Sequence, residues 1–120
     1  MNDRRQRLGR RGEVIAAAYL QARGYTILAR NLRCGRGEID LVATRDGLLV
    51  FVEVRTRSSA AFAHPEETVT RRKQARLLAA AEAYLQEHPE SPETWQFDLI
   101  AIEGHPDRQP VITHFENVFS

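Results

Sequence analysis

The chain has 120 residues, of which 42% are hydrophobic, and this is enough for a single domain over residues 1–120 with one buried core. No apolar run approaches the roughly 20 residues of a membrane span, no signal sequence follows Met1, and the lone Cys34 excludes an internal disulfide, so we expect a cytoplasmic protein without a membrane partner. The net charge of +1 hides an asymmetry: 16 of the 17 basic residues but only half of the 16 acidic ones lie in the first 76 residues, which carry about +8. Sixteen of those 17 cations are arginine, which indicates either phosphate contacts or an arginine-rich composition inherited from GC-rich DNA.

The N-terminal half alternates between helix and strand patterns. Residues 1–8 are polar and basic, and we expect them to form a flexible tail. The alanine-rich run from Gly9 to Arg23 predicts a helix that ends at Gly24. Its helically spaced apolar residues are Val14, Ile15, Ala18, Tyr19 and Ala22. Three strands are predicted next, over 25–30, 38–44 and 48–56, with a tight hairpin turn at Asp46-Gly47 between the last two.

The C-terminal half adds a second helix and two strands. Residues 58–68 predict a loop, and a helix is expected over 71–87 with Thr70 as its N-cap. The inner face of this helix is predicted to consist of Leu77, Leu78, Ala81, Tyr84 and Leu85. Strands over 96–103 and 111–115 complete the pattern. The order α-β-β-β-α-β-β indicates an α/β fold with a mixed central sheet flanked by helices.

The chemistry is concentrated in two strand segments, 37–42 (GEIDLV) and 51–55 (FVEVR). Counting outward from the hairpin turn places Asp40 opposite Glu53 on one face of the sheet, while alternation puts Arg55 beside Glu53. Two carboxylates this close repel each other unless a cation lies between them, and Mg²⁺ or Mn²⁺ bound by one or two carboxylates would serve. The backbone carbonyl of Val54 is a plausible further ligand. The pattern favours metal-assisted phosphodiester hydrolysis; in the simpler alternative each acid pairs with an arginine at a solvated sheet edge.

The same two segments resemble the signature blocks of the YraN family, a bacterial group classed as endonuclease-like. The similarity extends along the chain to Gly12-Glu13, Gly24-Tyr25, Arg30-Asn31, Lys73 and 97–101 (FDLIA). It implies the restriction-endonuclease-like, or PD-(D/E)XK, fold, a three-layer α/β/α arrangement. By this resemblance Asp40 and Glu53 are the metal-binding acids, and Glu13 matches a further acid that Holliday-junction resolvases of this fold often add from the first helix. Glu13 can equally be a capping or solvated residue.

Arg55 occupies the position at which the nuclease pattern has lysine. Arginine stays protonated in proteins and cannot act as a general base, although it can stabilise charge and orient phosphate. The missing lysine directs attention to Lys73, the one lysine in the chain, which lies in a basic cluster at the start of the second helix. We expect this cluster, with two further arginines, to contact phosphate: Arg71, Arg72, Lys73, Arg76, Arg57 and Arg11. Alternatively the cluster is a solvated face paired with Glu66 and Glu67.

Three functions are compatible with these observations. The first is a Mg²⁺- or Mn²⁺-dependent endonuclease, or nuclease-like protein, acting on structured or branched DNA. The second, favoured by Arg55, is a nucleic-acid-binding module that keeps the fold without the chemistry. The third is a protein-interaction role in which the acids merely pair with arginines. A two-fold homodimer would suit a four-way junction, but nothing in the sequence demonstrates one.

Overall fold

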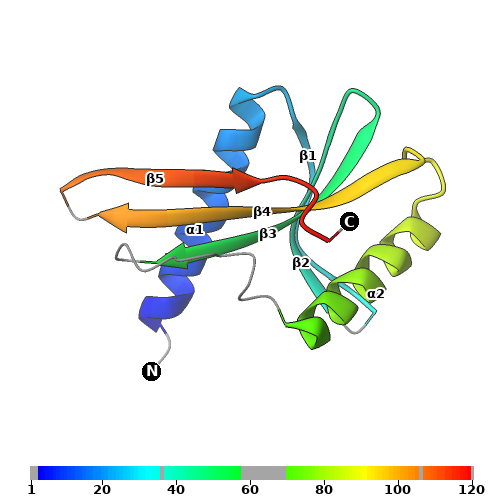
Figure 1. The fold of residues 1–120 in the computed structure, drawn as a ribbon, viewed down its shortest axis with the longest axis horizontal. Coiled ribbons are helices and arrows are strands. Elements are labelled where there is room, and N and C mark those ends of the chain that lie inside the picture. Colours follow the sequence, from blue (N-terminus) through cyan, green and yellow to red (C-terminus); the bar gives the residue numbers. More distant parts are fainter. Residues whose placement is uncertain (1–2, 36, 58–69, 106, 120) are drawn as a thin grey trace.

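The computed structural model describes residues 3–35, 37–57, 70–105 and 107–119; of 3–9 and 105 it describes the backbone alone. Its elements are α1 (Asp3–Ala22), β1 (Thr26–Cys34), β2 (Gly37–Arg45), β3 (Leu48–Arg57), α2 (Arg71–Glu87), β4 (Thr94–His105) and β5 (Arg108–Phe115). The strands form one sheet in sequence order, in which β3 and β4 are parallel and all other neighbours antiparallel (Figure 1). The mixed α/β class is confirmed. The loop expected over 58–68 lies outside the described residues.

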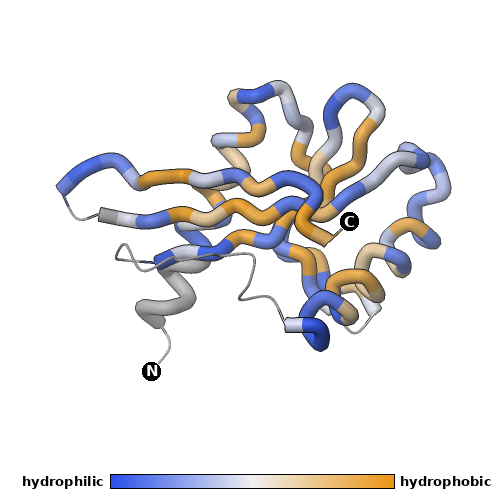
Figure 2. The backbone as a smooth tube through the Cα atoms, viewed as in Figure 1, coloured by the Kyte–Doolittle hydropathy of each residue, from blue (hydrophilic) through white to orange (hydrophobic). Residues whose placement is uncertain are grey.

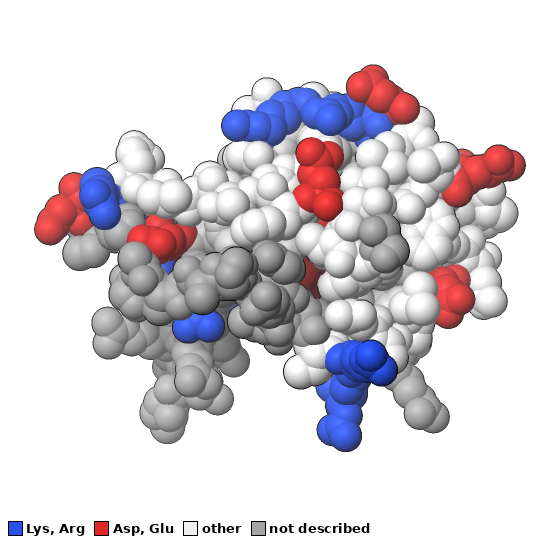
Figure 3. Space-filling view, viewed as in Figure 1, with Lys and Arg blue, Asp and Glu red and all other residues white. Residues whose placement is uncertain are grey.

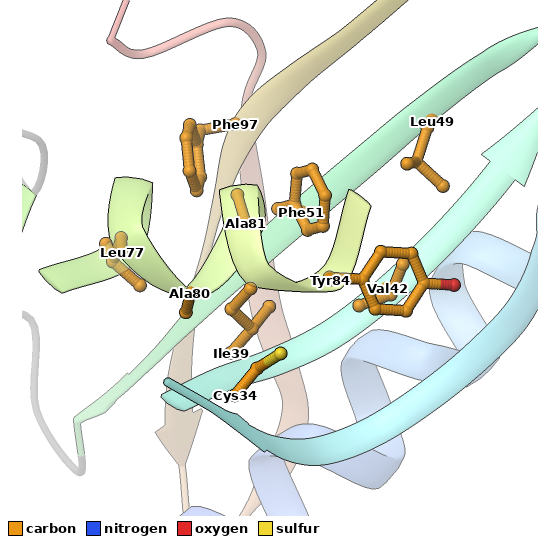
Figure 4. Close-up of a cluster of buried hydrophobic side chains, with 10 residues drawn as sticks. All are labelled: Cys34, Ile39, Val42, Leu49, Phe51, Leu77, Ala80, Ala81, Tyr84 and Phe97. Atoms are coloured by element: carbon orange, nitrogen blue, oxygen red, sulfur yellow. The ribbon is translucent and has the colours of Figure 1, made fainter. Parts of the chain in front are cut away.

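The two helices pack on opposite faces of the sheet, so each face has its own core. Strand residues alternate between these cores: Phe51 belongs to the cluster under α2, whereas Val50 and Val52 belong to the cluster under α1. Figure 2 shows the hydrophobic residues concentrated in the central strands, and Figure 4 shows the α2 cluster with Phe51 facing Ala81 and Tyr84. β3 is therefore buried on both sides, as its nearly unbroken apolar sequence requires.

The first helix departs from the sequence prediction in its start and in its buried face. It begins at Asp3, six residues before the expected start at Gly9, because extending a formed helix through good helix formers carries no nucleation cost. The flexibility expected of residues 1–8 stays a prediction. Val14 is 60% exposed, whereas Ala16, Ala17 and Leu20 are buried. The cause is Gly12, which lies so close to β3 that an added Cβ would overlap the Thr56 methyl group. This close approach turns the small residues toward the sheet.

The second helix and the hairpin follow the sequence rules closely. The Thr70 side chain accepts a hydrogen bond from the Lys73 N–H at 3.2 Å, which confirms the N-cap. Asp46 and Gly47 have φ values of 52° and 79°, as a tight hairpin turn requires. Leu78, however, is 43% exposed; the predicted inner position is taken by Ala80, which completes the helical stripe of Leu77, Ala80, Ala81 and Tyr84. Neither described helix is long and apolar enough to cross a membrane.

Candidate functional site

Asp40 and Glu53 meet where β2 and β3 separate. The paired register of the hairpin ends at Leu41 and Val52, so the two acids occupy the next opposed positions. Beyond this point a side chain takes the place of the backbone hydrogen bonds between the strands, because Asp40 Oδ2 accepts a hydrogen bond from the Val54 N–H at 2.8 Å. The two carboxyl groups interact, because Glu53 contributes to the raised pKa of Asp40. The opposed arrangement expected from the sequence is thus present, and Val54 contributes its N–H; a ligand role for its carbonyl oxygen stays a prediction.

The pair is poorly solvated. Glu53 is 7% exposed, and it projects from the face of β3 that α2 covers, whereas Val54 packs on the α1 side. Burial, followed by the Glu53 charge, raises the pKa of Asp40 from 3.8 to about 8, although the hydrogen bond from Val54 opposes this shift. The raised pKa favours the protonated form of Asp40 beside Glu53, at a place where a metal cation could replace the proton.

Two cationic side chains converge on Glu53. Lys73 Nζ, from the first turn of α2, lies 2.5 Å from Glu53 Oε2, and Arg55 Nε lies 3.9 Å from the same oxygen. Arg55 Nε is buried and has no hydrogen-bond partner among the described residues. A buried donor without a partner is costly, and an anion beside Glu53 would satisfy it.

Gly37 brings α2 close enough for Lys73 to reach the sheet. An added Cβ at this position would overlap the backbone carbonyl oxygen of Arg76 and would lie 3.0 Å from the Cβ of Ala80. The glycine that opens the GEIDLV segment therefore sets the distance between β2 and α2. By setting this distance, Gly37 allows Lys73 of α2 to lie beside the two acids.

The acids lie in a cleft of about 750 Å³ between α2 and the ends of β1 and β2. Its charged lining, apart from the two acids, consists of Arg33, Glu38, Arg72, Lys73 and Arg76. Figure 3 shows basic side chains projecting from the molecule where α2 begins. Of the phosphate contacts predicted from sequence, Arg72, Lys73 and Arg76 reach the cleft, whereas Arg71, Arg57 and Arg11 are not part of its described lining. Sequence reasoning missed Arg33, because nothing local distinguishes it from Arg30, the other arginine of its strand.

Glu13 lies near the pair, and its role as a further acid of the metal site stays a prediction. Its side chain hydrogen-bonds Asn31, and burial, with contributions from Glu38 and Glu53, raises its pKa above 4.5. Asn31 has a φ of 51°, a conformation asparagine tolerates, at the point where β1 bends past Asp40. In the described part of the chain no three acidic, histidine or cysteine side chains lie close enough to hold one metal ion. The Glu13 charge makes a small contribution to the raised pKa of Asp40.

A second polar cluster, which the sequence did not reveal, surrounds Asp98 on the α1 side of the sheet. Asp98 is 1% exposed and hydrogen-bonds the His114 ring at 2.7 Å, the Gln96 amide at 2.9 Å and the Asn117 N–H at 3.0 Å. Tyr19 completes the chain of contacts, with its hydroxyl 3.3 Å from His114 Nδ1. The cluster ties β5 and the C-terminal segment to β4 and α1.

The model of the uncharacterised protein family UPF0102 matches residues 12–102, a span that includes both acids, Arg55 and Lys73. The chain belongs to this family. UPF0102 is the YraN family, so the family resemblance seen in the two sequence blocks is confirmed. A UPF0102 protein of Roseiflexus castenholzii is 50% identical over 103 residues, covering 85% of this chain and 83% of its own. UPF0102 proteins of Clavibacter michiganensis (46% over 109 residues; 91% of this chain and 92% of the relative) and Pelotomaculum thermopropionicum (43% over 123 residues; 99% and 100%) are similar over almost the full length.

Proposed function

We propose that this UPF0102 member is a metal-dependent nuclease, or nuclease-like protein, that acts on DNA phosphodiesters, with structured or branched DNA as substrate. The observation that carries the proposal is the opposed pair of Asp40 and Glu53 in a basic cleft, with Lys73 and Arg55 beside Glu53. A mixed sheet with one helix on each face supports the finer proposal of a restriction-endonuclease-like fold.

The donor set fits one hard divalent ion. Mg²⁺ is commonly held by one or two protein carboxylates, with water and phosphate oxygens filling the other positions. Asp40 and Glu53 would supply those carboxylates, and the proton that burial retains on Asp40 is what the ion would displace. When bound, Mg²⁺ or Mn²⁺ would supply Lewis-acid stabilisation of a phosphoryl oxygen.

The remaining roles belong to the cations of the cleft. Lys73 takes the place of the lysine that the nuclease pattern has at Arg55, because its Nζ already contacts the second acid. Arg55 Nε, which has no hydrogen-bond partner among the described residues, would donate to the phosphate whose charge grows in the transition state. Arg33, Arg72 and Arg76 would hold the phosphates on either side.

Calorimetric titration of Mn²⁺ tests the proposal. We expect the wild type to bind the ion, and Asp40→Asn and Glu53→Gln to lose binding, because each removes one of two charged ligands. Glu38→Gln is the matched control: Glu38 lines the same cleft but is exposed, so its variant should bind like the wild type. Wild-type binding that persists in both acid variants would refute the metal site. Binding confined to the intact pair would justify cleavage assays on nicked, branched and single-stranded DNA.

One observation favours the second candidate, a DNA-binding module without catalysis. Arg55 carries a permanent charge, and the Lys73 ammonium already neutralises Glu53 in place of a metal. This function predicts DNA binding that weakens steeply with salt. It also predicts no cleavage with any divalent ion; cleavage that disappears in Asp40→Asn would eliminate it.

A further inference from the structure

A second pocket, of about 450 Å³, lies on the other side of the start of α2. Three aromatic residues, Trp95, Phe97 and Phe119, contribute to its lining, together with Leu78 of α2. Leu78, whose spacing predicted a core residue, is 43% exposed and faces this pocket instead. Arg71, the basic residue of the α2 cluster that does not reach the cleft, lines this pocket instead.

The pocket combines rigid aromatic surface with amide groups. The Trp95 ring is held edge-to-face against Phe51 and Phe97, with centroid separations of 5.7 and 5.9 Å, and Phe119 packs on Phe97 at 5.2 Å. Two amide residues, Gln74 of α2 and Asn117 of the C-terminal segment, also line the pocket. Flat apolar walls with amide residues beside them suit a planar heteroaromatic ligand that has donors and acceptors at its edge, and Arg71 adds affinity for an attached phosphate.

The two pockets lie on either side of α2, so one ligand that is long enough could occupy both. Arg72, Lys73 and Arg76 of α2 line the cleft, whereas Arg71, Ala75 and Leu78 line the second pocket, so a single helix separates them. A helix is about 10–12 Å across with its side chains, so a strand of a few nucleotides could reach from one pocket to the other. The first turn of α2 contains no acidic residue that would repel them.

We propose that the second pocket binds an unpaired nucleobase of a DNA strand whose backbone continues into the cleft. This inference rests on the proposed function and makes DNA with a single-stranded segment its substrate class. A base inside a duplex is stacked and paired, and it cannot present its face to Trp95 and Phe119.

Trp95, the one tryptophan of the chain, gives a direct readout. We would titrate a thymidine oligonucleotide of about twelve nucleotides, and an abasic strand of the same length, following Trp95 fluorescence and, separately, the anisotropy of labelled strands. The thymidine strand should quench Trp95 and bind at least about tenfold more tightly than the abasic strand, since base stacking contributes that much or more. Ala75→Leu, which fills the pocket from an exposed position, should abolish quenching and the tenfold difference. Ala79→Leu, exposed on the same helix but outside the described lining, should behave like the wild type.

Equal affinity for the two strands, or an unchanged preference in Ala75→Leu, would refute the proposal that the pocket binds a nucleobase. The nuclease proposal would not be affected, because the Mn²⁺ titration tests it separately. Preference for the thymidine strand without Mn²⁺ binding would keep the pocket and remove the nuclease. Light scattering on the wild type and both variants tests whether a second copy of the chain fills the pocket instead. If the wild type is a dimer that Ala75→Leu dissociates and Ala79→Leu does not, and the preference for the thymidine strand is unaltered, the pocket is a dimer contact and the inference is overturned.

Discussion

The close approach of α2 to β2 at Gly37 leads to a prediction of measurable size. In Gly37→Ala the new methyl group would overlap the Arg76 carbonyl oxygen and lie 3.0 Å from Ala80 Cβ. Carbon atoms in contact are ordinarily about 3.5–4.0 Å apart, so α2 must move by on the order of 0.5–1 Å. Overpacking of this kind costs about 1–3 kcal/mol of the free energy of unfolding. The movement would also separate Lys73 from Glu53, now 2.5 Å apart, and in a cleavage assay a displacement of about 1 Å can lower the rate by about 100-fold.

Urea unfolding followed by Trp95 fluorescence measures the stability term. Gly104→Ala is the matched control, because its Cβ would lie 3.7 Å from the nearest atom, the Arg57 carbonyl oxygen, which is an ordinary contact; we expect a change within about 0.5 kcal/mol. Adding Ala80→Gly to Gly37→Ala should not restore stability, because the overlap with the Arg76 backbone remains. A Gly37→Ala protein as stable as the Gly104→Ala control would refute the reasoning.

Three further predictions concern stability. Gly12→Ala should cost about 1–3 kcal/mol and Thr56→Ser, which removes the overlapped methyl group, should restore much of it in the double variant; additive losses in urea unfolding would contradict the contact. Because folding raises the pKa of Asp40 to about 8, the fold favours its protonated form, and the free energy of unfolding should fall as pH rises from about 5 to 8, by up to about 1.4 kcal/mol per pH unit. Asp40→Asn should remove this dependence of the free energy of unfolding on pH. Parallel pH profiles for the wild type and Asp40→Asn would contradict the raised pKa of Asp40. Asp98→Ala should cost about 3–5 kcal/mol, because it leaves three hydrogen-bonding partners unsatisfied inside the protein, whereas the exposed Glu116→Ala should change little; similar losses at both positions would rule out this role for Asp98.

Local rules account for the parts of the structure that the sequence predicted well. Gly24, with a φ of 89°, ends α1 where expected, since glycine adopts that conformation without steric cost. Thr70 caps α2 because a side-chain oxygen can satisfy an N–H of the first turn. Predictions that depended on which face of a helix would be buried were less successful. Val14 and Leu78 are hydrophobic yet exposed, because Gly12 and Ala80 let the helices pack more closely in another orientation.

The candidate site divides in the same way. A two-residue turn at Asp46-Gly47 fixes the hairpin register, and the register alone brings Asp40 opposite Glu53, so the sequence by itself determined the carboxylate pair. Only the tertiary structure decided that Lys73, twenty positions beyond Glu53 in the sequence, completes the pair. Its place depends on how closely α2 packs against the sheet, and that distance is set by contacts between residues far apart in the chain, which no short-range pattern specifies.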